Sequence, residues 1–135
     1  MRRAFGDAHY FLALLNPRDQ DYPRAKEFSA QWKGEIITTR WVLAEVANGL
    51  SAPPLRGVAA SFLLRLENNS FVRILPSEDV QFVRGFELYR RRADKAWSLT
   101  DCISFVVMQD EKLDEALTGD RHFEQAGFKA LLSAS

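Results

Sequence analysis

The chain has 135 residues, of which 47% are hydrophobic and 27% are charged, a composition typical of one folded domain and not of a disordered chain. Its 18 basic and 18 acidic side chains balance, which argues against a protein that only wraps nucleic acid with positive charge. A single cysteine, Cys102, excludes an internal disulfide framework and a cysteine-rich zinc site. The apolar runs are too short for a membrane span and we find no signal peptide, so we expect a cytoplasmic protein with no membrane partner.

Short β-branched or alternating runs are interleaved with longer runs of helical periodicity along the chain. In chain order, we predict strands at 2–7, 35–39, 71–75, 115–118 and 129–132, and helices at 9–15, 22–32, 41–50, 55–67, 77–93 and 98–111. The segment RHFEQAGF after Asp120 is predicted to be a turn that leads into the last strand. This alternation predicts an α/β fold: a single domain, residues 1–135, with a mostly parallel central sheet and helices on both faces.

Two acidic residues directly follow predicted strands. Asp7 closes the first strand, and Asp120 closes the strand that contains Thr118. Both have a structural interpretation, because Asp is a preferred helix N-cap and turn residue. Both also fall at the edge where ligands bind in such sheets, outside the carboxyl ends of the strands. Thr118 is then either a hydroxyl lining a site or an ordinary strand residue.

Two further acids fall in predicted helices. Glu45 is the only charge in the apolar segment WVLAEVA, where a carboxylate must be hydrogen-bonded, paired, metal-bound or able to reach solvent from the helix edge. Asp101 ends Ser98-Leu99-Thr100-Asp101, which matches a helix capping box, although an Asp in the first helical turn can also face a cation.

Four carboxylates brought together would repel one another strongly unless cations lay among them. The hard cations Mg²⁺ and Mn²⁺ prefer oxygen ligands, and an acidic pocket of this kind suits metal-assisted hydrolysis of a phosphodiester. Arg121 and His122, which follow Asp120, are interpreted as exposed turn residues and not as catalytic groups.

The segments GDAHYFLALLN, TTRWVLAEVANGL, WSLTDCISFVVMQ and ALTGDRHFEQAGF resemble the PIN-domain ribonucleases, in particular the single-domain VapC-like toxins of toxin–antitoxin pairs. The resemblance covers almost the whole chain and implies that one or two Mg²⁺ or Mn²⁺ ions are held for RNA hydrolysis by Asp7, Glu45, Asp101 and Asp120. It places Thr118 in the same site, and it implies an RNA substrate, a cognate antitoxin and a homodimer. The first segment departs from the family pattern, because Ala4-Phe5-Gly6 is less aliphatic than usual.

Two other classes of protein compete with this interpretation. A receiver domain of a signalling system needs an Asp after its third strand and a Lys after its fifth, whereas here the third strand leads into Pro76-Ser77 and Lys129 begins the last strand. A non-catalytic PIN-fold binding module, whose acids are only structural, stays open. Metal-dependent activity, or divalent ions bound at the acids, would separate it from an enzyme.

The densest basic group lies in the helix predicted at 77–93 and just after it. Arg84, Arg91 and Lys95 have the spacing of one helix face. That face is either a solvated surface or a rim that steers RNA phosphates towards the acids. The apolar helical segments 11–15 and 62–66 either cover the core or offer a surface to a second copy or an antitoxin.

Overall fold

A computed structural model describes residues 1–133, and its centre is one sheet of five parallel strands in the order β3-β2-β1-β4-β5. In chain order the strands are β1 (Arg3–Gly6), β2 (Glu35–Thr39), β3 (Val72–Leu75), β4 (Glu115–Leu117) and β5 (Lys129–Ala130). The predicted α/β fold with a parallel sheet is confirmed. The strand order also argues against a receiver domain, since doubly wound sheets of that type run 2-1-3-4-5.

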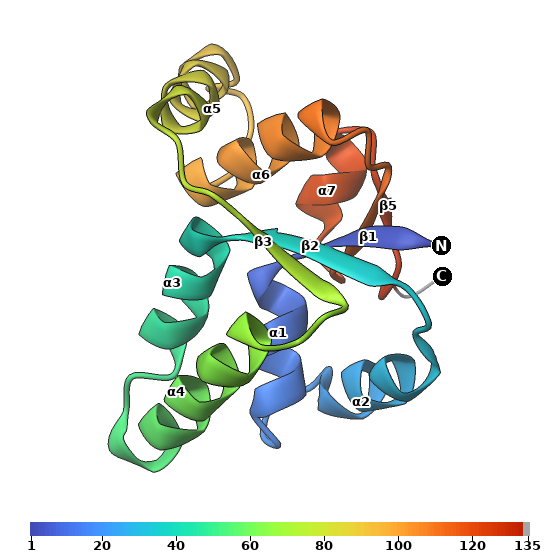
Figure 1. The fold of residues 1–135 in the computed structure, drawn as a ribbon. Coiled ribbons are helices and arrows are strands. Elements are labelled where there is room, and N and C mark those ends of the chain that lie inside the picture. The colour runs from blue at the N-terminus through green and yellow to red at the C-terminus, as the bar shows by residue number, and fades with distance from the viewer. Residues whose placement is uncertain (134–135) are drawn as a thin grey trace.

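Helices cover both faces of the sheet (Figure 1). One layer contains α1 (Ala8–Leu15), α2 (Tyr22–Gln31), α3 (Arg40–Gly49) and α4 (Pro53–Glu67). The other contains α5 (Asp79–Arg91), α6 (Leu99–Asp110) and α7 (Arg121–Gln125). Helix α6 is buried along most of its length, from Asp101 to Met108, because α5 and α7 pack against it and separate it from solvent.

The less aliphatic first segment forms the middle strand of the sheet, and its main-chain partners are β2 and β4. Ala4 and Phe5 are fully buried. Gly6 is needed for close packing, because a Cβ atom there would lie 2.7 Å from the ring of Phe11 and 2.8 Å from a methyl group of Ile36. The small residue at the end of this strand is therefore explained by the Phe11 ring and the Ile36 side chain that pack against it.

The segment after Asp120 is a short helix, α7, so the prediction of a turn there is wrong. The Asp120 side chain accepts the main-chain N–H of His122 at 2.9 Å and caps the helix. Phe123 is fully buried, with its ring 5.0 Å from that of Phe105 and 6.4 Å from that of Phe5. A five-residue helix has too few turns for a periodic signal and is stable only because tertiary packing holds it.

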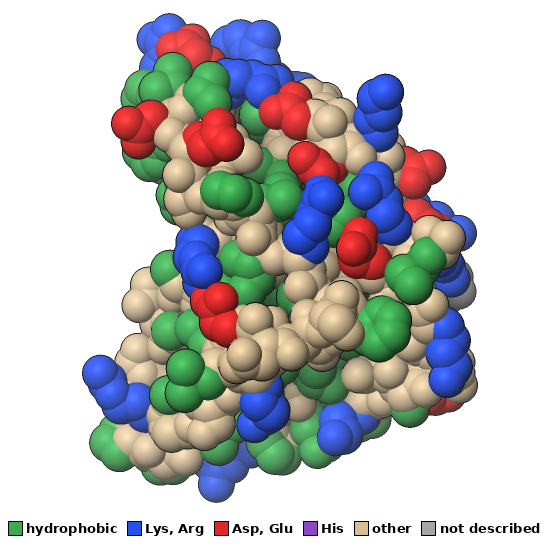
Figure 2. All heavy atoms as spheres, in the orientation of Figure 1, with side chains coloured by type: hydrophobic (Ala, Val, Ile, Leu, Met, Phe, Trp, Pro, Cys, Tyr) green, Lys and Arg blue, Asp and Glu red, His purple; other side chains and the backbone are tan. Residues whose placement is uncertain are grey.

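The apolar helical segments have divided roles. Phe11 and Phe62 belong to the core, with ring centroids 5.5 Å apart, while Leu64 is exposed. Many of the exposed large apolar side chains lie instead on α5: Val80, Phe82, Val83, Phe86 and Tyr89. Hydrophobic side chains are visible over this helix at the top of the molecule (Figure 2). Within residues 1–133, no helix is long and apolar enough to span a membrane.

Candidate active site

The carboxyl edge of the sheet brings together all four acids that the sequence singled out. Asp7 ends β1 and caps α1, Asp120 follows β4 and caps α7, Glu45 lies in α3 directly after β2, and Asp101 lies in the first turn of α6. They line an open pocket of about 380 Å³. The other lining residues are Ala8, His9, Leu12, Ala96, Ser98 and His122.

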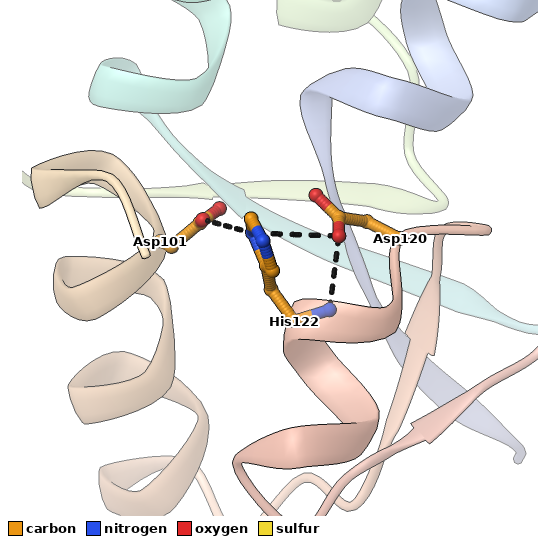
Figure 3. Close-up of side chains that lie close together, drawn as sticks. All are labelled: Asp101, Asp120 and His122. Carbon is orange, nitrogen blue, oxygen red and sulfur yellow. Dashed lines mark hydrogen bonds and ion pairs between the residues drawn. The ribbon is translucent and has the colours of Figure 1, made fainter. Parts of the chain in front are cut away.

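His122 lies between two of these carboxylates (Figure 3). Its Nδ1 atom is 3.0 Å from Asp101 Oδ2 and 3.4 Å from Asp120 Oδ1. Because an ionised carboxylate can only accept, Nδ1 carries the hydrogen and donates it to Asp101. Asp101 Oδ2 also accepts the main-chain N–H of Ser98 at 3.1 Å. The interpretation of His122 as an exposed turn residue is therefore wrong: it is partly buried at the centre of the acidic group, because α7 turns it inward.

Thr118 joins two of the acids from behind the pocket. Its hydroxyl donates to Asp7 Oδ2 at 2.8 Å and accepts the main-chain N–H of Asp120 at 3.1 Å. The residue is fully buried and does not line the pocket. Its hydroxyl hydrogen is used by Asp7, so this geometry suits a residue that positions the acids and does not touch substrate.

His9 supports the same edge from α1. Its Nδ1 accepts the main-chain N–H of Gly119 at 3.0 Å, so Nε2 must carry the hydrogen that is shared with Asp21 Oδ2 at 3.0 Å. This pair of bonds ties α1 and the Asp21 segment to the residue that precedes Asp120. Both histidines of the chain stand two residues after a strand-ending Asp, in Asp7-Ala8-His9 and Asp120-Arg121-His122. This repeated spacing is the feature of the sequence that indicates that both histidines lie near the acids.

The carboxylates raise one another's affinity for protons. Burial, and to a lesser extent the charge of Asp101, raises the pKa of Asp7 to about 7, against the opposing effect of the Thr118 hydrogen bond. Burial and the charge of Asp101 also raise the pKa of Glu45. The pKa of Asp101 is raised by burial and by Asp120, while hydrogen bonds from Ser98 and His122 lower it. The pocket therefore holds more negative charge than its own surroundings stabilise.

The three predicted RNA-binding residues do not share one helix face. Helix α5 ends at Arg91, so Lys95 lies beyond it and lines a different hollow. Arg84 and Arg91 line a hollow between α5 and the second half of α6, where Arg84 donates to Asp110 at 2.6 Å. The prediction of a common face is wrong because the helix pattern stops one turn earlier than the basic spacing suggested.

The comparison with known families agrees with this geometry. Residues 4–129 match the PIN domain family, so the chain belongs to that family. Its fold is that of the VapC20 toxin of Mycobacterium tuberculosis, a sarcin–ricin loop cleaving toxin: the TM-score is 0.85, with 24% identity over 93% of this chain and 95% of that one.

A toxin–antitoxin complex from Klebsiella pneumoniae contains a chain of similar fold. Its TM-score is 0.61, with 19% identity and 87% of each chain covered. No curated protein sequence matches the chain. At these identities the solved structures establish the shared fold.

Proposed function

We propose that this protein is an endoribonuclease that uses Mg²⁺ or Mn²⁺ held by Asp7, Glu45, Asp101 and Asp120. One observation carries the proposal: four carboxylates from four separate segments converge on one pocket at the carboxyl edge of the sheet. The raised pKa values of Asp7, Glu45 and Asp101 are the expected signature of acids that lack their counter-charge.

The donors present fit a hard divalent cation. The pocket offers carboxylate oxygens from four acids and the imidazole of His122, and it contains no thiolate, since Cys102 is buried and does not line it. Oxygen-rich donor sets of this kind suit Mg²⁺ and Mn²⁺. When bound, such a cation offsets charge on the phosphate and lowers the pKa of a water molecule.

The protein's own residues would hold these acids in place. Thr118 keeps the Asp7 carboxylate and the Asp120 main chain at a fixed separation. His9 anchors Gly119, next to Asp120. His122 and Ser98 both donate to one oxygen of Asp101, which orients its carboxylate and leaves Oδ1 without a hydrogen bond from the described residues. Preorganisation of this kind lets acids act together without rearrangement at the moment of reaction.

A specific observation favours a second candidate, the non-catalytic binding module. Asp7 and Asp120 cap helices, and Asp101 completes a capping box with Ser98. Three of the four acids therefore stabilise the N-terminus of a helix. Two features oppose it. Glu45 caps no helix, and Asn would cap α1 about as well as Asp7 without placing a buried charge beside Asp101.

Cleavage of a mixed RNA pool with and without EDTA separates the two candidates. We expect Mn²⁺ or Mg²⁺ to restore cleavage that EDTA removes, and Mn²⁺ to raise the melting temperature of the protein, since a ligand that binds only the folded state stabilises it. Equal cleavage in excess EDTA would refute the metal-dependent mechanism. Absence of both cleavage and a Mn²⁺ shift would favour the binding module.

We also infer a cognate antitoxin and self-association in the cytoplasm. The fold shared with the VapC20 toxin and with a chain of a toxin–antitoxin complex supports the antitoxin. The exposed apolar side chains in the first half of α5, Val80, Phe82 and Val83, support self-association, because clustered apolar surface marks contact sites. A small open reading frame that overlaps the start of this gene would support the first inference. A monomer mass by light scattering at micromolar concentration would contradict the second.

A further inference from the structure

A second hollow of about 580 Å³ opens beside the acidic pocket, between the end of α5 and the loop that leads to α6. The two hollows share Ala96, and the second is also lined by Cys102, which directly follows Asp101. Its other lining residues are Phe86, Tyr89, Arg90, Arg92, Ala93, Lys95 and Trp97. We call this hollow the aromatic–basic cleft. Ala96 therefore borders both the acidic pocket and the aromatic–basic cleft.

Two aromatic rings form one wall of the aromatic–basic cleft. Phe86 and Tyr89 are 41% and 48% exposed, and their rings stack with centroids 6.3 Å apart and an interplanar angle of 18°. Neither ring belongs to the buried core. Exposed ring faces of this kind are platforms for nucleobases, because every base has a face that can stack whatever its sequence.

Cationic side chains surround these rings. Lys95 makes no ion pair with any residue in 1–133, and Arg90 makes only an exposed contact of 3.5 Å with Glu87. Figure 2 shows Lys and Arg side chains gathered at the end of the molecule that α5 forms. A charge without an acidic partner, such as that of Lys95, or with only a weak exposed one, such as that of Arg90, can neutralise phosphates and release counterions on binding.

The loop that carries Lys95 is held firmly. Trp97 is buried, packs edge-on against Phe105 at 5.1 Å, and donates its indole N–H to Gln125 at 3.0 Å. The Arg92 guanidinium lies 5.0 Å above the Trp97 ring and makes two bonds to Asp94, of 3.0 and 3.1 Å. The cleft is therefore preformed, which lowers the entropy cost of binding.

The other flank of α5 is less suited to RNA. There Arg84 is already paired with Asp110, which leaves Arg91 as the cation of that hollow without an ion pair in residues 1–133. That hollow extends along α6 to Val106 and Gln109, more than one helical turn beyond Asp101, and it shares no residue with the acidic pocket.

We propose that the aromatic–basic cleft binds the single-stranded RNA next to the cleaved phosphate, with bases on Phe86 and Tyr89 and backbone phosphates at Arg90 and Lys95. The inference rests on the proposed ribonuclease function. An acidic pocket attracts RNA poorly by itself, so neighbouring positive charge has to bring the strand to it. A single strand fits better than a duplex, since paired bases keep their faces stacked on one another.

Binding of a labelled, short single-stranded RNA of mixed sequence tests the proposal. Fluorescence anisotropy would be measured with the Asp101→Asn/Asp120→Asn variant as parent, so that cleavage does not interfere. We expect Tyr89→Ala to weaken binding roughly five-fold or more, the lower end for loss of one stacked base, while Tyr89→Phe retains it. We expect Lys95→Ala to reduce the slope of log affinity against log salt by about 0.7. Lys26→Ala, on the opposite layer, is the matched control and should change neither quantity.

Each outcome decides between the alternatives. If the parent binds RNA and both Tyr89→Ala and Lys95→Ala bind as tightly as the parent, the cleft is not the RNA path. A loss of affinity confined to Arg84→Ala and Arg91→Ala would assign the strand to the other flank of α5. If wild-type protein cleaves no RNA and the parent binds none, the proposed function and the cleft assignment fail together. Cleavage by wild type combined with unaffected cleft variants refutes only the cleft.

Discussion

Replacing Asp7 by Asn should stabilise the metal-free protein and yet remove most of its RNA cleavage. The hydrogen bonds from the Thr118 hydroxyl and the His9 main chain both end on Asp7 Oδ2, and the amide oxygen of Asn can accept both. Asn also caps helices about as well as Asp. The substitution therefore removes a buried charge and keeps the local structure, while the site loses one anionic ligand.

The magnitude follows from the pKa of Asp7, which burial and the Asp101 charge raise from 3.8 to about 7. At 1.36 kcal/mol per pKa unit, ionising Asp7 in the folded, metal-free protein costs about 4 kcal/mol, an upper value. The pKa of Asp7 is higher in the folded protein than in the unfolded chain. As far as Asp7 contributes, the free energy of unfolding is therefore highest below about pH 4 and falls as the pH rises to about 7. Asn does not titrate. Its advantage should be near zero at about pH 4 and largest above about pH 7.

Melting temperatures in EDTA at about pH 5 and about pH 8 would measure the effect. A domain of this size shifts its melting temperature by roughly 4 °C per kcal/mol, so we expect Asp7→Asn to melt up to roughly 16 °C above wild type at the higher pH and by much less at the lower. Added Mn²⁺ should stabilise wild type and reverse the order. Asp114→Asn, at an exposed carboxylate, is the control and should change little. If Asp7→Asn melts at or below wild type at about pH 8 in EDTA, the reasoning from buried charge is wrong.

Three further predictions concern the site and its supporting packing. Glu45→Gln should reduce RNA cleavage strongly and slightly stabilise the metal-free protein, because burial and the Asp101 charge raise the pKa of Glu45. If the variant cleaves RNA at the wild-type rate, Glu45 is a solvent-exposed side chain with no part in the reaction. Asp101→Asn and Asp120→Asn should each stay within about 1 kcal/mol of wild type in stability. Each should reduce the rise in melting temperature that Mn²⁺ causes, and their losses of cleavage should be non-additive. If either variant keeps the full Mn²⁺ effect, that acid only caps its helix. Gly85→Ala should destabilise by about 1–3 kcal/mol or more in denaturant unfolding, because its Cβ would lie 2.9 Å from the α6 backbone. At Gly57 an added Cβ would meet no atom within 4 Å, so Gly57→Ala should be neutral or stabilising. If Gly85→Ala and Gly57→Ala change the stability equally, the packing argument is wrong.

Local chemistry in the sequence was enough to place most of the secondary structure. The β-branched run 35–39 forms β2, and the Ser98-to-Asp101 capping box begins α6 as expected. The alternation of strands and helices also predicted the parallel sheet, because parallel strands need crossover connections. Since the carboxyl ends of parallel strands share one edge, the positions of Asp7 and Asp120 after their strands predicted that both lie at that edge.

Tertiary structure decided what depends on contacts between distant segments. The strand order β3-β2-β1-β4-β5 decides which helices begin beside the pocket. It brings Glu45 of α3 close enough to Asp101 for the Asp101 charge to raise the pKa of Glu45. Helix α7 exists because Phe123 packs between β1 and α6, and only that helix turns His122 towards Asp101. The separation of Lys95 from Arg84 follows from where α5 ends against α6. Capping and alternation act over a few residues and can be read along the chain, whereas burial and charge repulsion act through space between segments that the sequence leaves far apart.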